Sequence, residues 1–276
     1  EPGWRYAVST ELVTQNSQVT TLTNAIKKMI PQFKLALPAH LPPERLARIA
    51  LTELRKNPAL SRCTVPSVLG SLMQAATLGL EPGVLGQAYL IPYRNECQLV
   101  PGWQGIVDLV SRAGRAAVWT GAVYEGDLFE YQLGSEPFVR HQPQGEDAPD
   151  KLTHVYAVGS INGVQGRIVE VWPVKKITRH RDRFNKVGQR HYSYEHFEMY
   201  GRKVALLQVL KYIPKSIELV KVIQIEHGLT TGEPVDLDIP IDTVITNADL
   251  VVDAETAVGG ADYGGQDATA TSALGI

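Results

Sequence analysis

The amino-acid sequence predicts an α+β fold in which a central, mainly antiparallel β-sheet is flanked by helices. Apolar residues recur at helical spacing between residues 22 and 79. Short segments rich in β-branched and aromatic residues follow between residues 88 and 172, and two of them flank Asn162-Gly163, the strongest short signal for a β-hairpin. Helical spacing then returns up to residue 225. This order of helices, strands and helices is typical of an α+β protein.

Three helices are expected before the first strand. The first has an apolar stripe formed by Leu22, Ile26, Met29, Ile30 and Phe33. The second begins at Pro42-Pro43-Glu44, where proline fits the first turn, and ends before Asn57-Pro58. The third begins at Pro66 and ends at Gly79, since glycine commonly closes a helix in the left-handed conformation.

The middle of the chain is expected to contain short strands and one helix. The helix covers residues 103–113 and ends at Gly114. The expected strands cover residues 88–93, 98–100, 116–124, 128–133, 154–161 and 164–172. The polar, proline-containing segment 134–151 is expected to be a loop.

Helices are expected again from Pro173 onward. The first of these helices carries Lys175, Lys176 and Arg179, and the basic, polar stretch over residues 181–190 that follows it is expected to be a loop outside the core. A long helix over residues 194–212 and a short one over residues 216–225 follow it. At about 100° per residue, Lys203 and Lys211 lie about 80° apart around the long helix, so both are expected on the same side.

Charge is distributed unevenly along the 276 residues. The chain has 27 Lys and Arg against 29 Asp and Glu, a net charge of -2. Residues 167–225 hold 13 basic and 5 acidic side chains, whereas residues 226–276 hold 10 acidic residues and no Lys or Arg. The chain through Ile225 is therefore +8 and the rest is -10. We expect a flexible arm over residues 1–19, a polyanion-binding core over 20–227 and an acidic, disordered tail over 228–276.

The motifs of several enzyme classes are absent from the sequence. No GxxxxGK[ST] phosphate loop is present, and no GxGxxG follows an expected strand. His180-Arg181-Asp182 resembles a kinase catalytic loop, but Asn185 follows the aspartate after three residues instead of five. His191 and His196 lack the HExxH spacing of zinc hydrolases.

Two groups of acidic residues leave open the possibility that the protein is a Mg²⁺-dependent nuclease. Glu125 and Asp127 border an expected turn, and Glu146, Asp147 and Asp150 fall in the expected loop. Turn preferences and solvated charge explain both groups more simply.

The cysteines and the hydropathy pattern indicate the cellular compartment in which the protein works. Cys63 and Cys97 lack zinc-binding spacing and suit a reducing cytosol, with one bridge between them left open. No apolar run approaches the ~18 residues that a membrane span needs, and no signal peptide is evident. We therefore expect a cytoplasmic protein.

Residues 167–225 combine their basic side chains with aromatic ones, as single-stranded nucleic acid requires. The aromatic residues are Trp172, Phe184, Tyr192, Tyr194, Phe197, Tyr200 and Tyr212. Cations neutralise phosphates and release counterions, while aromatic rings offer stacking surfaces that tolerate any base. A solvated helix face with core aromatics, or a surface for an acidic protein, is the alternative.

Seven blocks of sequence occur in the order of a known family. They are residues 48–60 (RIALTELRKNPAL), 78–93 (LGLEPGVLGQAYLIPY), 98–114 (QLVPGWQGIVDLVSRAG), 123–127 (VYEGD), 153–158 (THVYAV), 198–203 (EMYGRK) and 210–214 (LKYIP). Together they resemble the RecT family of phage single-strand annealing proteins, over roughly residues 35–225. The resemblance implies that family's fold, a central sheet crossed by helices with DNA in a basic groove.

The resemblance also implies a function and partners. RecT-like proteins anneal complementary strands without ATP and without covalent catalysis, as oligomeric rings or helical filaments on single-stranded DNA and the annealed duplex intermediate. They work beside a phage 5′–3′ exonuclease and the host single-strand-binding protein. We therefore expect a phage- or prophage-encoded homo-oligomer in the bacterial cytoplasm, with no membrane partner, no required cofactor and at most a modulating role for Mg²⁺. A Mg²⁺-dependent nuclease and a self-assembling structural phage protein are the alternatives.

The resemblance and the basic segment together give a set of expected DNA-binding residues. The set is Arg94, Trp103, Arg112, Arg183, Phe184, Lys186, Arg190, Arg202, Lys203 and Lys211. Its cations are expected to hold the phosphates of the first strand and leave the base edges open to a second. Its two rings are expected to stack on bases or wedge between them, with core packing as the alternative for either ring.

The chain departs from the family pattern at two places. Gln104 stands where relatives often carry Arg or Lys, and Tyr200-Gly201 replaces the usual Ala-Lys. Arg183, Lys186 and Arg190 in the basic stretch are expected to compensate for these two cations.

Two regions outside this set have expected roles. Residues 20–80 are candidates for contacts between subunits, although the same apolar stripes would equally serve internal packing. The acidic tail is expected to compete with DNA for the basic groove, to dock a basic partner, or only to keep the protein in solution.

Overall fold

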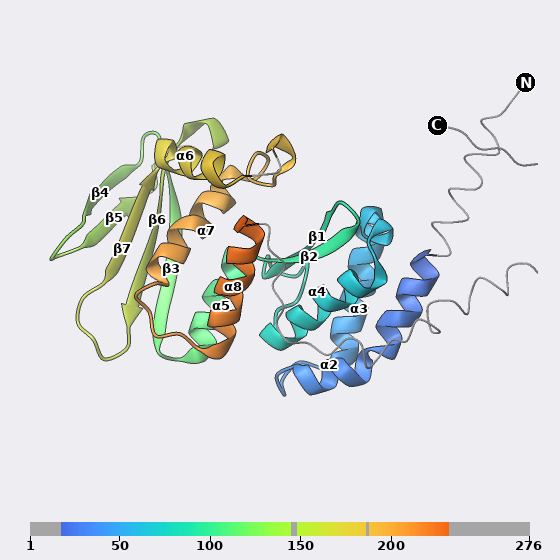
Figure 1. Ribbon diagram of the computed structural model, residues 1–276. Helices are drawn as coiled ribbons and strands as arrows, with labels where there is room; N and C mark the ends of the chain where they lie inside the picture. Colours follow the sequence, from blue (N-terminus) through green and yellow to red (C-terminus); the bar gives the residue numbers. More distant parts are fainter. Residues whose placement is uncertain (1–17, 145–147, 186–187, 232–276) are drawn as a thin grey trace, which may run out of the picture.

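The computed structural model describes residues 18–144, 148–185 and 188–231 (Figure 1). Its helices are a segment over residues 18–28, α2 (Ile30–Ala36), α3 (Pro43–Lys56), α4 (Val65–Leu78), α5 (Trp103–Ala113), α6 (Val174–Phe184), α7 (Phe197–Val209) and α8 (Ile217–Thr231). Its strands are β1 (Ala88–Tyr93), β2 (Glu96–Pro101), β3 (Ala116–Tyr124), β4 (Leu128–Gln132), β5 (Phe138–Gln142), β6 (Leu152–Ile161) and β7 (Ile168–Pro173). Short 3₁₀ turns cover Pro58–Arg62, Pro149–Lys151 and Gly188–Arg190. Most of the expected arm, and the expected tail from residue 232 onward, lie outside the described residues.

The N-terminal helices follow the apolar stripes of the sequence. Leu22, Ile26 and Phe33 are buried, as their spacing predicts. Thr64 caps the start of α4 by accepting a hydrogen bond from the backbone of Ser67 at 3.4 Å. Gly79 ends α4 in the left-handed conformation with φ at 62°. The predicted C-terminal cap of this helix, Gly79, is therefore confirmed.

The strands form three antiparallel sheets, so the predicted fold class is confirmed. β1 pairs with β2, β4 pairs with β5, and a three-stranded sheet has the order β3-β6-β7. The hairpin predicted around Asn162-Gly163 is present as β6 and β7. Its second strand begins only at Ile168, so residues 162–167 form a longer connection than the two-residue turn.

Two layers cover the β3-β6-β7 sheet. Helix α7 lies across one face, where Gly159 of β6 leaves room for it: a Cβ at that glycine would lie 2.6 Å from Cγ1 of Val209. The β4–β5 hairpin covers part of the opposite face, with Phe129 and Val139 packed against Val158 and its neighbours. Figure 1 shows the sheet between these two layers.

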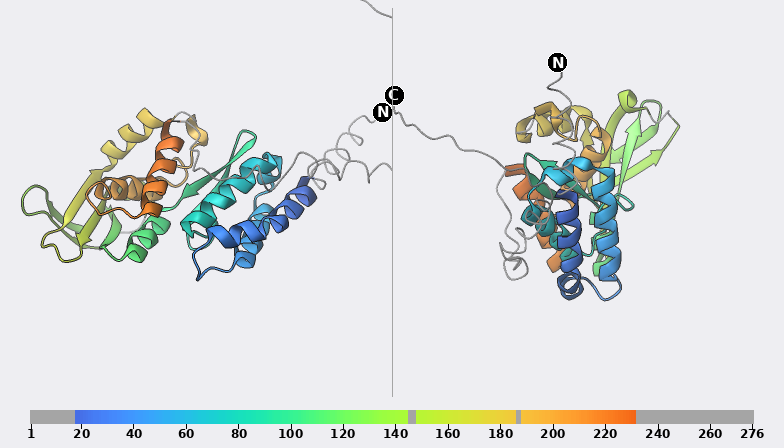
Figure 2. Two further views of the ribbon diagram at one scale, coloured as in Figure 1. Left: turned by 60° about the horizontal axis from the view of Figure 1, so that its bottom comes forward. Right: turned by 90° about the vertical axis from the view of Figure 1, so that its right-hand side faces the viewer.

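Helix α8 joins the sheet-containing half of the molecule to the helical half. It contacts α4, α5 and β2 through the side on which Leu219, Val222 and Ile225 are buried. Figures 1 and 2 show it between the two halves. Buried residues between Leu22 and Ile225 form the main core, and Val158, Val169 and Val171 form a smaller cluster beneath the β4–β5 hairpin. Along the described part of the chain, no helix is both long and apolar enough to cross a lipid bilayer.

Three expectations about elements were wrong. The segment 134–151 is not all loop, because it contains β5, whose alternate residues Val139 and His141 face the sheet while the residues between them are solvated. The stretch 181–190 is helical up to Phe184, since charged residues are good helix formers and basic ones suit a helix C-terminus. Helix α7 ends at Val209, with Leu210 as its C-cap ahead of Pro214.

Candidate nucleic-acid interface

Helix α6 presents a row of cationic and aromatic side chains beside the end of β7. Lys176, His180 and Phe184 recur every four residues and therefore lie along one side of the helix, and Trp172, at the end of β7, packs against the first two of them. The ammonium of Lys176 lies 3.9 Å from the centre of the Trp172 ring. The His180 ring lies 5.4 Å from that ring and 4.7 Å from the Phe184 ring.

Two further cations extend this row. Arg183 lies 5.3 Å from the centre of the Phe184 ring, and Lys211 comes from the turn after α7. We call the set of Lys176, His180, Arg183, Phe184 and Lys211 the α6 surface. Arg183, Phe184 and Lys211 are exposed, so the outer part of this surface is open to a ligand.

His180 lies among the cations of the α6 surface, and its pKa is lowered. Burial lowers this pKa first, and the charges of Lys211, Arg183 and Lys176 lower it further. The hydroxyl of Tyr200 lies 2.9 Å from Nδ1 of the ring and fixes its orientation. Three cations thus act on one imidazole, which makes the surface suited to a polyanion.

Nearby carboxylates are already engaged. Glu170 accepts a hydrogen bond from Nε1 of Trp172 at 3.1 Å, and its charge only partly offsets the burial that lowers the pKa of Lys176. Asp182 pairs with Arg181 at 2.9 Å. The Arg181 guanidinium also lies 4.1 Å from the centre of the Tyr194 ring and so ties the following segment to α6.

Arg202 and Trp103 belong to an internal network. The Arg202 guanidinium lies 4.2 Å from the centre of the Trp103 ring, donates to Glu198 at 2.9 Å and donates to the carbonyl of Thr120 at 3.0 Å. Glu198 also accepts a hydrogen bond from the hydroxyl of Tyr124 at 2.8 Å. These contacts link α7, α5 and β3, and they leave little of Arg202 to hold a phosphate.

Lys203 does not reach the surface. Its side chain is only 6% exposed, and its ammonium lies 2.7 Å from Oε1 of Glu226 in α8. Burial opposes its charge, but Glu226 and Tyr192 outweigh burial and raise its pKa. The expectation that Lys203 and Lys211 share one accessible side is therefore corrected, because α7 ends before Lys211 and α8 covers Lys203.

The remaining expected residues are dispersed. Arg112 pairs with Asp108 at 3.0 Å and donates to the carbonyl of Leu78 at 2.9 Å, where it holds the end of α4. Arg94 lies at the tip of the β1–β2 hairpin with φ at 55° and its guanidinium 5.6 Å from the Tyr93 ring. Lys186 and the Arg190 side chain lie outside the described residues.

Asp127, one of the acidic residues considered for a metal site, has structural partners. Asp127 accepts hydrogen bonds from the backbone of Tyr124 and Gln144 at 2.8 Å each and contacts Nε2 of His141 at 2.9 Å. It thereby organises the turn before β4, as turn preferences predict. Glu146 and Asp147 lie outside the described residues. Within the described residues, no group of three or more His, Cys, Asp or Glu side chains lies close enough to hold a metal ion.

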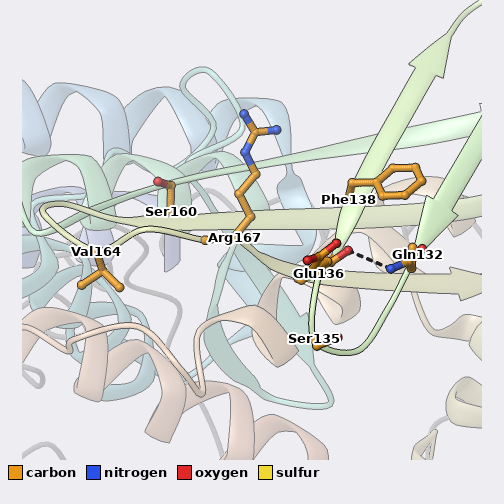
Figure 3. A pocket seen from close by; sticks show the side chains of 9 residues that line it. Gln132, Ser135, Glu136, Phe138, Ser160, Val164 and Arg167 are labelled. Atoms are coloured by element: carbon orange, nitrogen blue, oxygen red, sulfur yellow. Dashed lines mark hydrogen bonds between the residues drawn. The ribbon is translucent and has the colours of Figure 1, made fainter.

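An open pocket lies at the other end of the sheet, between the β4–β5 and β6–β7 connections. Figure 3 shows Gln132, Glu136 and Phe138 on one side of it and Ser160 and Arg167 on the other. On that first side, Nε2 of Gln132 donates a hydrogen bond to the backbone carbonyl of Glu136 at 3.2 Å. With one arginine and one carboxylate among its lining residues, this pocket is less suited to a phosphate chain than the α6 surface.

Sequence reasoning did not include Lys176 and His180 among the candidate interface residues. The signal was present as the four-residue spacing of Lys176, His180 and Phe184, which places a lysine, a histidine and a phenylalanine in one row on a helix. It was overlooked because residues 181–190 were expected to form a loop, so Phe184 did not count as helical.

Comparison with known proteins decides the family. The family model described as the RecT family matches residues 44–233. The chain belongs to the RecT family. It is 36% identical over 250 residues to protein RecT of Escherichia coli strain K12, which covers 87% of this chain and 90% of that protein. It is also 28% identical over 123 residues to the uncharacterized protein YqaK of Bacillus subtilis strain 168, covering 44% and 42% of the two chains.

Membership of the RecT family confirms the resemblance found in the sequence. It makes this chain a DNA-binding protein of recombination, of the class that anneals single strands. The matched residues 44–233 include α6, α7 and the whole α6 surface.

Proposed function

We propose that this RecT-family chain anneals complementary DNA strands without ATP, and that the first strand lies along the α6 surface. The observation that carries this proposal is the grouping of cations with rings on one surface: Lys176 lies 3.9 Å from the Trp172 ring, and Arg183 lies 5.3 Å from the exposed Phe184 ring. Besides burial, the charges of Lys176, Arg183 and Lys211 all lower the pKa of His180. The cations would neutralise successive phosphates, and the Phe184 ring would offer a stacking face that does not depend on base identity.

The mechanism requires only binding and release. Contacts to the phosphates hold the strand while its Watson–Crick edges stay open to a second strand. Correct pairing then supplies the free energy, at a mean stacking contribution of about 1.4 kcal/mol per base-pair step. No covalent step and no nucleotide hydrolysis is needed, in keeping with the absence of a phosphate loop from the sequence.

The assembly follows from the size of the interface. Along α6 the row from Lys176 to Phe184 spans eight residues, which at about 1.5 Å per residue is about 12 Å and accommodates only a few nucleotides. We propose that subunits align their α6 surfaces in an oligomeric ring or helical filament, with a 5′–3′ exonuclease and the host single-strand-binding protein as partners. We propose further that Mg²⁺ modulates this activity without being required.

The test is the annealing rate of two complementary oligonucleotides labelled with a donor and an acceptor dye. The proposal expects faster annealing with the protein than without it, equal in the presence and absence of ATP and retained in EDTA. Failure to accelerate annealing would contradict the proposal. Shortening of end-labelled strands in Mg²⁺ would instead support the nuclease alternative, which no cluster among the described residues favours.

A further inference from the structure

One exposed leucine is held in a backbone conformation that leucine rarely adopts. Leu85 has φ at 48° and is 80% exposed. It lies between Gly83 and Gly86, with φ at 72° and 67°. Glycine adopts this conformation readily, whereas a residue with a Cβ is strained by about 1–2 kcal/mol. The fold therefore carries both backbone strain and an exposed apolar side chain at the same residue.

Hydrogen bonds hold the loop that presents Leu85. The backbone N–H of Gly83 donates to the carbonyl of Ala88 at 2.8 Å, and that of Gln87 donates to the carbonyl of Val84 at 3.0 Å. The side chain of Gln87 accepts a hydrogen bond from the backbone of Glu81 at 3.0 Å. These bonds tie both ends of the loop together and leave Leu85 at its tip.

The loop rests on the first turn of α5. The N–H of Gly102, the N-cap of that helix, donates to the carbonyl of Gln87 at 2.8 Å. Gly86 packs directly against the side chain of Gln104, with no room for a Cβ. Trp103, between these two contacts, lies against the Arg202 guanidinium. Leu85 is thus fixed to a platform that includes an aromatic ring and a cation.

The Leu85 side chain is largely solvated, so packing of that side chain within the described fold does not offset its backbone strain. A protein interface would need a broad patch, typically about 1,000 Å² or more in total, whereas Leu85 stands on a narrow loop between two glycines. Single apolar side chains, including leucine, act as wedges between base steps in proteins that deform nucleic acid. A hydrogen-bonded loop with one apolar tip fits that use.

We propose that Leu85 inserts between two adjacent bases of the bound strand and interrupts their stacking. This inference rests on the proposed function, since it requires a DNA strand on this molecule. Interrupting the stack at one step per subunit would hold the strand open at regular intervals, with the bases between the wedges free to pair. Leu85 would then act as a positioning residue for annealing.

The experiment uses the full chain and single-stranded DNA containing 2-aminopurine, whose fluorescence rises when its neighbours unstack. The wild-type protein and Leu85→Met, which keeps an apolar tip, should increase the fluorescence on binding. Leu85→Asn should lose this increase, although asparagine tolerates the left-handed conformation and should leave thermal stability unchanged or higher. Leu35→Asn is the matched control, because Leu35 is 82% exposed on α2, and it should behave as wild type.

The outcomes separate the wedge from the proposed function. DNA binding is followed independently by fluorescence anisotropy. If wild type and Leu85→Asn both bind and give the same fluorescence increase, or if wild type binds with no increase, the wedge is refuted while the annealing function stands. If Leu85→Asn changes the mass in light scattering without DNA, Leu85 is a protein contact and the wedge is refuted. A wild-type protein that binds no single-stranded DNA would contradict both proposals.

Discussion

The salt dependence of DNA binding should report the cations of the α6 surface directly. Each cation that neutralises a phosphate releases counterions when it binds, so the affinity falls as salt concentration rises. Besides burial, Lys176, Arg183 and Lys211 all lower the pKa of His180 in the free protein, so we expect one strand on the α6 surface to meet all three charges. Replacing all three by alanine should therefore weaken binding and also flatten its salt dependence.

The expected magnitude follows from the number of cations. For single strands each phosphate contact contributes about 0.7 to the slope of log affinity against log salt, so losing three contacts should reduce that slope by roughly 2. Between 50 and 200 mM salt, such a change corresponds to a roughly twentyfold smaller loss of affinity in the variant than in the wild type.

The assay is a fluorescence-anisotropy titration of labelled single-stranded DNA at several salt concentrations. A triple variant of Arg55, Arg62 and Arg140 to alanine removes the same charge from exposed positions on α3, the following 3₁₀ turn and β5, away from α6. Its slope should stay close to that of the wild type. Equal slopes for the wild type and the α6 triple variant would refute the assignment, as would equal losses in both triple variants.

Three further predictions concern the fold and its titrating groups. Lys203→Ala should lower the free energy of unfolding by about 3–5 kcal/mol because it leaves the Glu226 carboxylate buried without its partner, whereas Lys203→Met with Glu226→Met should recover most of it in denaturant unfolding. Burial and cations hold the pKa of His180 below its ordinary 6.5, so its contribution to stability is full above pH 6.5 and is lost as the pH falls. Bound phosphate should raise that pKa, so affinity for single-stranded DNA should increase as the pH falls below 6.5, and His180→Gln should flatten this profile in anisotropy. Gly159→Ala should destabilise by about 1–3 kcal/mol in thermal unfolding, because the new methyl group would press on Val209; an unchanged melting temperature would show that α7 can shift.

Much of the fold followed from local patterns in the sequence. Helix α5 begins and ends where Trp103 and Gly114 indicate, and Gly79 closes α4 as expected. These elements were predictable because caps and apolar spacing act over a few residues. Strand β5 was not predictable from the sequence. Only Val139 and His141 of this strand face the sheet, and its pairing with β4 leaves no local signal in the sequence.

The site was less predictable than the fold for a physical reason. The sequence shows which residues are charged but not which charges are already paired. Lys203 and Arg202 match the family pattern, yet both are already paired. Glu226 of α8 pairs with Lys203 across a separation along the chain that no spacing rule covers. Glu198 pairs with Arg202 as an i,i+4 neighbour on α7. Phe184 joins Lys176 and His180 in one row because α6 extends to that residue.

The position of the strand is tested most directly by photocrosslinking. Phe184 on the α6 surface and Tyr131 on β4 are 38% and 43% exposed and lie on different layers of the molecule. Each would be replaced in turn by a photoreactive benzoylphenylalanine, and the protein irradiated with radiolabelled single-stranded DNA. We expect efficient crosslinking from position 184 and only background from position 131. Crosslinking from 131 without crosslinking from 184 would contradict the placement of DNA on the α6 surface.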